Sequence, residues 1–148
     1  INEVILEQSL ETHEHNFNKK NNISLDTNDF DISFARGLNL EDGAATLTAF
    51  SARLITSKIN FLLKEYDKKN VNIIICGGGR KNISLIKQIK LNSKKNLSFY
   101  NSEDFGLNGD FIESQAFGYI AIRSVLSLPI SFPLTTGCSA PCSGGEII

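Results

Sequence analysis

The sequence contains no methionine and no tryptophan among its 148 residues, and it begins with isoleucine. Because a translated chain normally starts with methionine, we interpret the sequence as a fragment and expect part of its chemistry to lie upstream of Ile1. The absence of a motif from these residues is therefore weak grounds for excluding a function.

Cysteine and histidine are scarce, with three and two residues. An odd number of cysteines without a secretory marker predicts reduced thiols rather than a disulfide framework. Cys138 and Cys142 have a spacing that could serve a metal, but a structural zinc site takes about four ligands and the histidines are far away in sequence, so we predict no metal site. His13 and His15 are expected on a solvated helix surface, and Cys76 is expected to be a small buried hydrophobe.

Neither sign of charge dominates, and no apolar run is long. The 15 basic and 16 acidic residues give a net charge of -1, which excludes a general attraction to nucleic acid or to an anionic membrane. No run approaches the roughly 20 apolar residues that a transmembrane helix needs, and no signal peptide opens the chain. We therefore expect a cytoplasmic protein without nucleic-acid or membrane partners, folded as one domain because 41% of its residues are hydrophobic.

The stretch VNIIICGGGRKN, residues 71–82, organises the rest of the chain. Its β-branched apolar run predicts a central parallel strand covered on both faces. Gly77, Gly78 and Gly79 permit positive φ and a close approach of a ligand, and Asn82 can cap the helix that follows. Free backbone amides at such a turn suit an anion or a polar ligand. The stretch matches neither GxxxxGK[ST] nor GxGxxG, so a nucleotide site and a purely structural packing of helix on strand both stay open.

The remaining elements follow from hydrophobic spacing and turn residues. We predict a helix over residues 4–17, a polar loop to residue 31, and a long main packing helix from Leu40 to Tyr66, capped by Asn39. A second parallel strand is predicted at residues 97–100, and a second glycine turn then leads to a helix from Ile112 to Val125 capped by Asp110. Pro129 and Pro133 end that helix and keep the chain extended, and the tail is predicted to be a loop or a short last strand.

Three charged residues near the two glycine turns are candidates for ligand contacts. Arg80 and Lys81 could face a nucleotide or could be solvated, and for Lys81 we favour solvation. Glu113 falls in the first turn of the second helix, at the same sheet edge as the glycine turn if the strands are parallel. It could reach a bound hydroxyl or only stabilise the helix terminus. No serine, histidine and aspartate set predicts a nucleophilic triad, and no base-reading element is present.

Four segments carry a family resemblance: DFDISFARGLNLEDGAATLTAFSA, ICGGGRKN, GDFIESQAFGYIAIRS and LPISFPLTTG, in this order. From about Leu25 to the end, the chain resembles the C-terminal part of anhydro-N-acetylmuramic acid kinases. These belong to the superfamily of sugar kinases, actin and Hsp70 chaperones. The resemblance implies an α/β fold, an incomplete RNase H-like (actin-like ATPase) lobe with a short, mostly parallel sheet flanked by helices. Residues 1–30 would form a helix and linking loop, and residues 31–148 the adenosine-side region of the ATP site.

The resemblance also implies a reaction. The family uses ATP and Mg2+ to convert 1,6-anhydro-N-acetylmuramic acid into N-acetylmuramic acid 6-phosphate while water opens the anhydro bridge, in peptidoglycan recycling. The general base, an aspartate, and the phosphate loop would both precede Ile1, so no catalytic residue is assigned in this segment. Glu113 resembles a residue that helps to hold the sugar. The implied nucleotide-binding positions are Gly77, Gly78, Gly79, Arg80 and Asn82.

The chain departs from the family in one loop and in its extent. Asn21, Asn22 and Ile23 stand where many relatives have a proline-lysine pair, and Thr27 stands at an arginine position, so contacts made there are in doubt. The opening strands of the lobe are missing, which predicts an unpaired sheet edge prone to aggregation or to homodimer formation. The alternative function is a non-catalytic nucleotide-binding or interaction module of the same fold.

Overall fold

The structure, a computed structural model, describes residues 1–17, 27–65, 70–94 and 96–146. The helices and strands are α1 (Glu3–Phe17), α2 (Leu40–Glu65), β1 (Val71–Ile75), α3 (Ile83–Asn92), β2 (Leu97–Asn101), α4 (Ile112–Val125) and α5 (Pro133–Thr136), with 3-10 helices η1 (Thr27–Asp29), η2 (Ser33–Ala35), η3 (Gly78–Lys81) and η4 (Ser102–Phe105).

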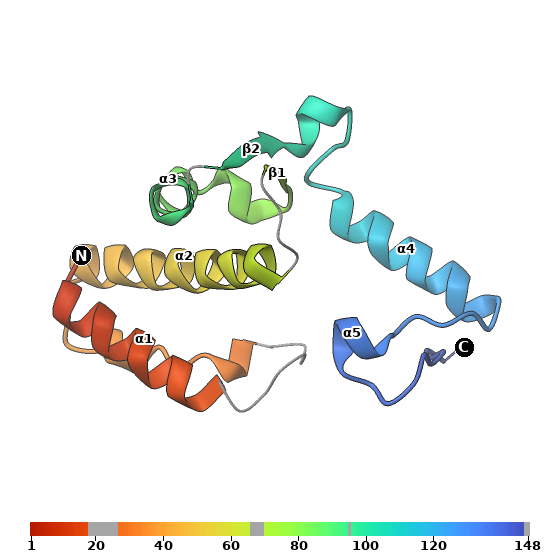
Figure 1. Cartoon of the computed structure of the whole chain (residues 1–148), viewed down its shortest axis with the longest axis horizontal. Helices are drawn as coiled ribbons and strands as arrows, with labels where there is room; N and C mark the ends of the chain where they lie inside the picture. Colours follow the sequence, from red (N-terminus) through yellow and green to blue (C-terminus); the bar gives the residue numbers. More distant parts are fainter. Residues whose placement is uncertain (18–26, 66–69, 95, 147–148) are drawn as a thin grey trace.

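In Figure 1, α2 lies between α1 and α3, the two strands lie beside α3, and α4 and α5 are set to one side toward the C-terminus. The α/β class is confirmed for these residues, and the RNase H-like assignment stays a prediction.

Helix α2 is the main packing element, as its hydrophobic spacing predicts. Its first turn is closed by Asn39, whose Oδ1 accepts a hydrogen bond of 2.8 Å from the Asp42 amide, which confirms the predicted cap. Farther along, Ala49 and Phe50 are buried against two leucines of α1, Leu6 and Leu10. Burial of these side chains holds α1 on α2, since apolar area removed from water is the main stabilising contribution. Tyr66, the predicted last residue of α2, and residues 18–26 of the polar loop predicted after α1 lie outside the described residues.

His13 differs from its predicted solvated position. Its ring stacks on Phe30 with centroids 5.4 Å apart and meets the Phe50 ring edge-on at 5.9 Å. Partial burial lowers the pKa of His13. The prediction is wrong because His13 lies about one turn after Leu10, on the same face of α1 as Leu6 and Leu10, and this face packs on α2. The side chain of His15 lies outside the described residues.

The strands β1 and β2 pair in parallel, in register from Val71 opposite Leu97 to Ile75 opposite Asn101, which confirms the predicted unit of strand, helix and strand. Burial alternates along β1, however, and Ile74 is 48% exposed. The prediction of a strand covered on both faces is therefore wrong for the described residues, and Cys76, which follows β1, is exposed rather than buried. A β-branched run predicts the strand but not which faces are covered. The other edge of β1 has no partner strand in the described part of the chain.

The segment after β2 corrects two further predictions. Phe111 precedes the first turn of α4 and no side chain caps this helix, so Asp110 is not its cap. After α4, the chain stays extended only to Phe132, and Pro133 then opens the short helix α5. Of the two alternatives predicted for the tail, a loop or a short last strand, the structure shows a loop with one antiparallel bridge between Ser131 and Cys142. None of the helices in the described ranges combines the length and apolarity that a membrane crossing requires.

Candidate functional site

The glycine turn begins where β1 ends. Gly77 has φ 75° and ψ 176°, a backbone conformation that residues with a Cβ atom rarely adopt. The 3-10 helix η3 starts at the next residue. The Gly77 amide donates a hydrogen bond of 2.9 Å to the Gly109 carbonyl and is therefore occupied. The amides of Gly78 and Gly79 open the 3-10 helix and have no hydrogen-bond partner among the described residues. Two adjacent backbone donors are thus free at the carboxyl end of the sheet.

Asn82 links this turn to a hollow. Its Oδ1 accepts a hydrogen bond of 3.0 Å from the Leu85 amide, which confirms the predicted cap of α3. Its side-chain nitrogen Nδ2, unlike its backbone N–H, makes no hydrogen bond within the described residues and is free to donate to a ligand. The hollow beside it has a volume of about 360 Å³ and lies between the N-terminal halves of α2 and α3, with Ile1, Ala44, Ala45, Thr48, Asn82, Ser84 and Gln88 as lining residues.

Arg80 turns from the glycine turn toward two acidic segments. Its Nη1 donates to the Gly77 carbonyl at 2.9 Å and to Asp110 Oδ1 at 2.7 Å. Its Nε and Nη2 donate to Glu103 Oε1 at 3.1 and 2.7 Å. The Arg80 side chain is only 10% exposed, whereas Lys81, which pairs with Asp110 at 2.8 Å, is 65% exposed. The solvated position that we favour for Lys81 is confirmed, and Arg80 is held by protein groups.

The charges of this cluster stabilise one another. Hydrogen bonds from Arg80, and then from Lys81, lower the pKa of Asp110 to about 2. A hydrogen bond to its own backbone, followed by the contact with Arg80, lowers the pKa of Glu103. The two carboxylates in turn raise the pKa of Arg80. All of these groups are charged at neutral pH, and two cations face two carboxylates.

Sequence reasoning missed the residues that complete this cluster. Ser102 is 1% exposed, and Glu103 Oε1 accepts a further hydrogen bond of 3.2 Å from the Gly109 amide. A Cβ atom on Gly109 would lie 2.6 Å from Ser102 Oγ and 2.7 Å from Arg80 Nε, so no other residue fits without displacing them. The available signal is the position of Glu103 just after β2, at the edge where the two turns are predicted to meet.

Glu113 lies at the same sheet edge, as the parallel strands require. It is in the first turn of α4 and is exposed, and the preceding turn is joined to the glycine turn by the hydrogen bond between Gly77 and Gly109. Figure 1 shows α4 leaving the sheet edge from this point. The predicted placement of Glu113 near the glycine turn is thus supported by topology, and its contact with a sugar stays a prediction.

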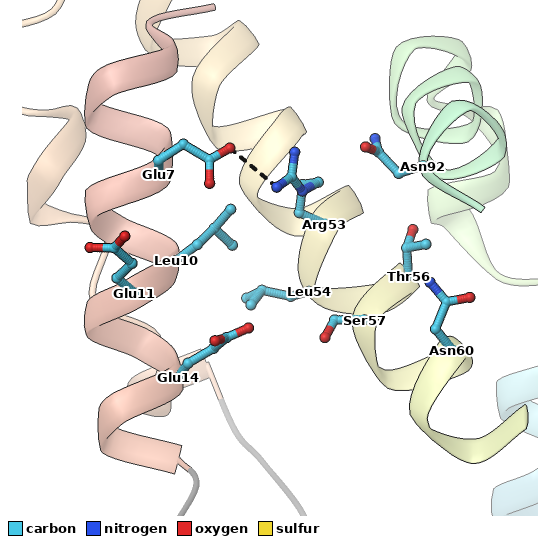
Figure 2. Close-up of a pocket in the computed structure, with 10 residues that line it drawn as sticks. All are labelled: Glu7, Leu10, Glu11, Glu14, Arg53, Leu54, Thr56, Ser57, Asn60 and Asn92. Atoms are coloured by element: carbon cyan, nitrogen blue, oxygen red, sulfur yellow. Dashed lines mark hydrogen bonds and ion pairs between the residues drawn. The ribbon is translucent and has the colours of Figure 1, made fainter. Parts of the chain in front are cut away.

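A second hollow, of about 430 Å³, lies between α1 and α2 and contains none of the predicted site residues. Figure 2 shows Glu7 and Glu14 of α1 pointing toward α2, with Glu7 paired to Arg53 at 3.1 Å. The Asn60 Oδ1 atom is buried there without a hydrogen-bond partner in the described residues, although Figure 2 shows it pointing away from α1. Of these two hollows, only the smaller includes Asn82 and adjoins the glycine turn. In the described ranges, no three His, Cys, Asp or Glu side chains gather closely enough to hold a metal ion.

Comparison with known proteins identifies the family. A family model described as anhydro-N-acetylmuramic acid kinase matches residues 17–148. The anhydro-N-acetylmuramic acid kinase of Pelagibacter ubique is 44% identical over 146 residues, which are 99% of this chain and 39% of that protein. That of Zymomonas mobilis is 43% identical over 124 residues, 84% of this chain and 32% of that protein. Anhydro-N-acetylmuramic acid kinase 2 of Jannaschia sp. is 41% identical over 124 residues, 84% of this chain and 31% of that protein.

The chain therefore spans 39% or less of the length of these relatives. The matched region contains the glycine turn, the Arg80 cluster and the first turn of α4. Because the family model covers well over half of its residues, this chain belongs to the anhydro-N-acetylmuramic acid kinase family.

Proposed function

We propose that this chain is the C-terminal, adenosine-side part of an ATP-dependent kinase that converts 1,6-anhydro-N-acetylmuramic acid into N-acetylmuramic acid 6-phosphate. The observation that carries the proposal is a glycine turn with two free backbone donors beside Asn82, in a chain that belongs to this kinase family. The reaction serves peptidoglycan recycling, and we place it in the cytoplasm, where the recycled sugar and ATP meet.

The nucleotide end of ATP fits the groups at the glycine turn. The amides of Gly78 and Gly79 and the side-chain nitrogen of Asn82 are free donors, and ribose hydroxyls and adenine nitrogens are acceptors. The hollow of about 360 Å³ beside Asn82 has small side chains from α2 and polar ones from α3, which leaves room for a flat ring. Gly77 and Arg80 shape the turn that presents these donors.

The sugar end is proposed at the first turn of α4, where the Glu113 carboxylate can accept hydrogen bonds from sugar hydroxyls. Water must attack the anomeric carbon, the bond from that carbon to the 6-oxygen breaks, and the 6-oxygen takes the γ-phosphoryl group. We assign the general base that removes the water proton to a part of the enzyme outside these residues. The described residues offer no set of metal ligands, so we assign Mg2+ to the phosphates of ATP and to groups outside this chain.

The test is a kinetic assay of the intact protein that contains this chain, with purified 1,6-anhydro-N-acetylmuramic acid and ATP. We expect ATP-dependent formation of the 6-phosphate. Glu113→Gln is expected to raise the KM for the sugar by about tenfold and the KM for ATP by much less, since it weakens a charged hydrogen bond. Glu41→Gln, the same change in the first turn of α2, is the matched control.

Equal effects of Glu113→Gln on both substrates would remove its sugar role and leave the kinase assignment standing. Failure of the unsubstituted protein to phosphorylate the sugar would overturn the assignment. In that case a titration with ADP tests the alternative function, because a non-catalytic module of the same fold would still bind nucleotide.

A further inference from the structure

We propose that Arg80 is a positioning residue that clamps the glycine turn to the turn before α4, and so couples the nucleotide side of the site to the sugar side. The proposal rests on the proposed kinase function. It assigns Arg80 a role that is exercised through other protein groups, without contact to ATP.

The first observation is that Arg80 joins three separate segments. Its guanidinium contacts the Gly77 carbonyl in its own turn, Glu103 in η4 and Asp110 just before α4. These segments follow the carboxyl ends of both parallel strands. A planar guanidinium with fixed donor directions can hold three such acceptors in one geometry, which a lysine ammonium cannot reproduce.

The second observation is that Arg80 has little capacity left for a ligand. The guanidinium has five N–H donors, and four of them are engaged: one at Nε, two at Nη1 and one at Nη2. The Arg80 side chain is only 10% exposed. The two carboxylates also balance the charges of Arg80 and Lys81. A cation that recruits phosphate needs surplus positive charge, and this cluster has none.

The third observation is that the backbone is built around the clamp. Glu103 Oε1 also accepts from the Gly109 amide at 3.2 Å, and the Gly77 amide donates to the Gly109 carbonyl at 2.9 Å. Gly109 has no room for a Cβ atom because Arg80 Nε and Ser102 Oγ occupy it. The turns are therefore interlocked at side-chain and main-chain level.

The clamp ends next to the proposed sugar contact. Asp110 is two residues before the first residue of α4, and Glu113 is in the first turn of this helix. Loss of the Arg80 contacts would release the Gly77–Gly79 turn and the start of α4 together. A residue that only touched ATP would disturb the nucleotide end alone.

The experiment compares Arg80→Ala, Arg80→Lys and Glu103→Gln in the intact protein by steady-state kinetics with both substrates varied. Glu103→Gln leaves the guanidinium in place and tests the clamp without removing Arg80. We expect Arg80→Ala and Glu103→Gln to raise the KM for ATP and the KM for the sugar together, by about tenfold for the alanine variant, because each breaks hydrogen bonds between charged groups. Arg80→Lys is expected to recover only part of the loss.

Two further measurements sharpen the result. The double variant Arg80→Ala/Glu103→Gln is expected to be no worse than Arg80→Ala alone, because both remove the same interaction. Arg53→Ala, which breaks the ion pair with Glu7 between α1 and α2, is the matched control and is expected to change both KM values less than about twofold. Circular dichroism checks that each variant is folded. If Arg80→Ala does not fold, the kinetics of Glu103→Gln and Arg80→Lys test the clamp instead.

A rise in the KM for ATP alone, with Glu103→Gln unaffected, would assign Arg80 to direct nucleotide contact and overturn the clamp. Additive effects of Arg80→Ala and Glu103→Gln would also overturn it. Absence of sugar phosphorylation by the unsubstituted protein would instead refute the proposed function, so the two failures are distinguishable.

Discussion

The amide of Gly77 donates a hydrogen bond of 2.9 Å to the carbonyl of Gly109, so the turn after β1 is joined directly to the turn that leads to α4. The two glycines have different requirements. Gly77 needs a positive φ of 75°, whereas Gly109 needs empty space beside its Cα atom. This main-chain contact brings the proposed nucleotide and sugar ends of the site to one sheet edge.

The space beside Gly109 predicts a substitution effect. Gly109→Ala places a Cβ atom 2.6 Å from Ser102 Oγ and 2.7 Å from Arg80 Nε, so the Arg80 hydrogen bonds must be displaced. We expect lower stability, by about 1–3 kcal/mol as for other overpacked sites, in thermal or urea unfolding. Gly118→Ala is the control, because nothing lies within 4 Å of its Cβ position in α4 and alanine favours the helix. Equal effects of the two substitutions would contradict the packing of Arg80 against Gly109.

The pKa of Asp110 predicts an acid-dependent loss of stability. Its folded value of about 2 lies below its ordinary value of 3.8, because Arg80 and Lys81 favour the charged form. A lowered folded pKa contributes stability that is complete above about pH 4 and is lost as the pH falls toward about 2. Asp110→Asn should therefore reduce the decline in unfolding free energy between pH 4 and pH 2, measured by urea titration. Parallel pH profiles for both proteins would show that Asp110 is not engaged by the two cations.

Asn82 has two roles that substitutions can separate. Asn82→Ala removes the acceptor for the Leu85 amide and is expected to cost about 0.5–2 kcal/mol of stability as a lost helix cap. Asn82→Asp keeps that acceptor and removes the free side-chain donor. We expect Asn82→Asp to retain stability while ADP binding, measured by calorimetry on the intact protein, weakens by about fivefold to tenfold. Unchanged ADP affinity in Asn82→Asp would place the nucleotide elsewhere.

The surface of α4 predicts self-association of the 148-residue chain on its own. Phe117, Ile122 and Val125 are 64%, 61% and 64% exposed, on a helix that has no buried residue. We expect the chain to sediment as more than a monomer in analytical ultracentrifugation, and Phe117→Ser with Ile122→Ser to shift it toward monomer. Leu40→Ser is the control, since this 88% exposed side chain is on α2. A monomeric unsubstituted chain would show that α4 is not a contact surface.

Local patterns predicted a large part of the fold correctly. The glycine turn, the parallel strand pair and the caps at Asn39 and Asn82 are interactions within a few residues, or follow from hydrophobic periodicity. Gly77 adopts the positive φ that the glycine run indicates. The placement of the Glu113 turn beside the glycine turn also follows from the sequence, because parallel strands end at the same sheet edge.

Contacts between distant segments account for the errors. Asp110 has the residue type and position of a helix cap, but Arg80 and Lys81, which are distant in sequence, engage its carboxylate instead. His13 has a polar side chain on the helix face that packs on Phe50. The apolar run predicts that Ile74 and Cys76 are buried, yet both are exposed in the described part of the chain. For Asp110 and His13, the neighbour that decides the outcome comes from another part of the chain, whereas Ile74 and Cys76 have no such neighbour over them in the described residues.

The sequence by itself determined the longer helices, the two strands, the glycine turn and the kinase family resemblance. Only the tertiary structure decided that Arg80 binds Glu103 and Asp110, and that Gly109 has to be a glycine. The physical reason is the separation along the chain over which each effect acts. Propensity and periodicity act over a few residues, whereas an ion-pair cluster forms where folding brings distant charges within hydrogen-bond distance.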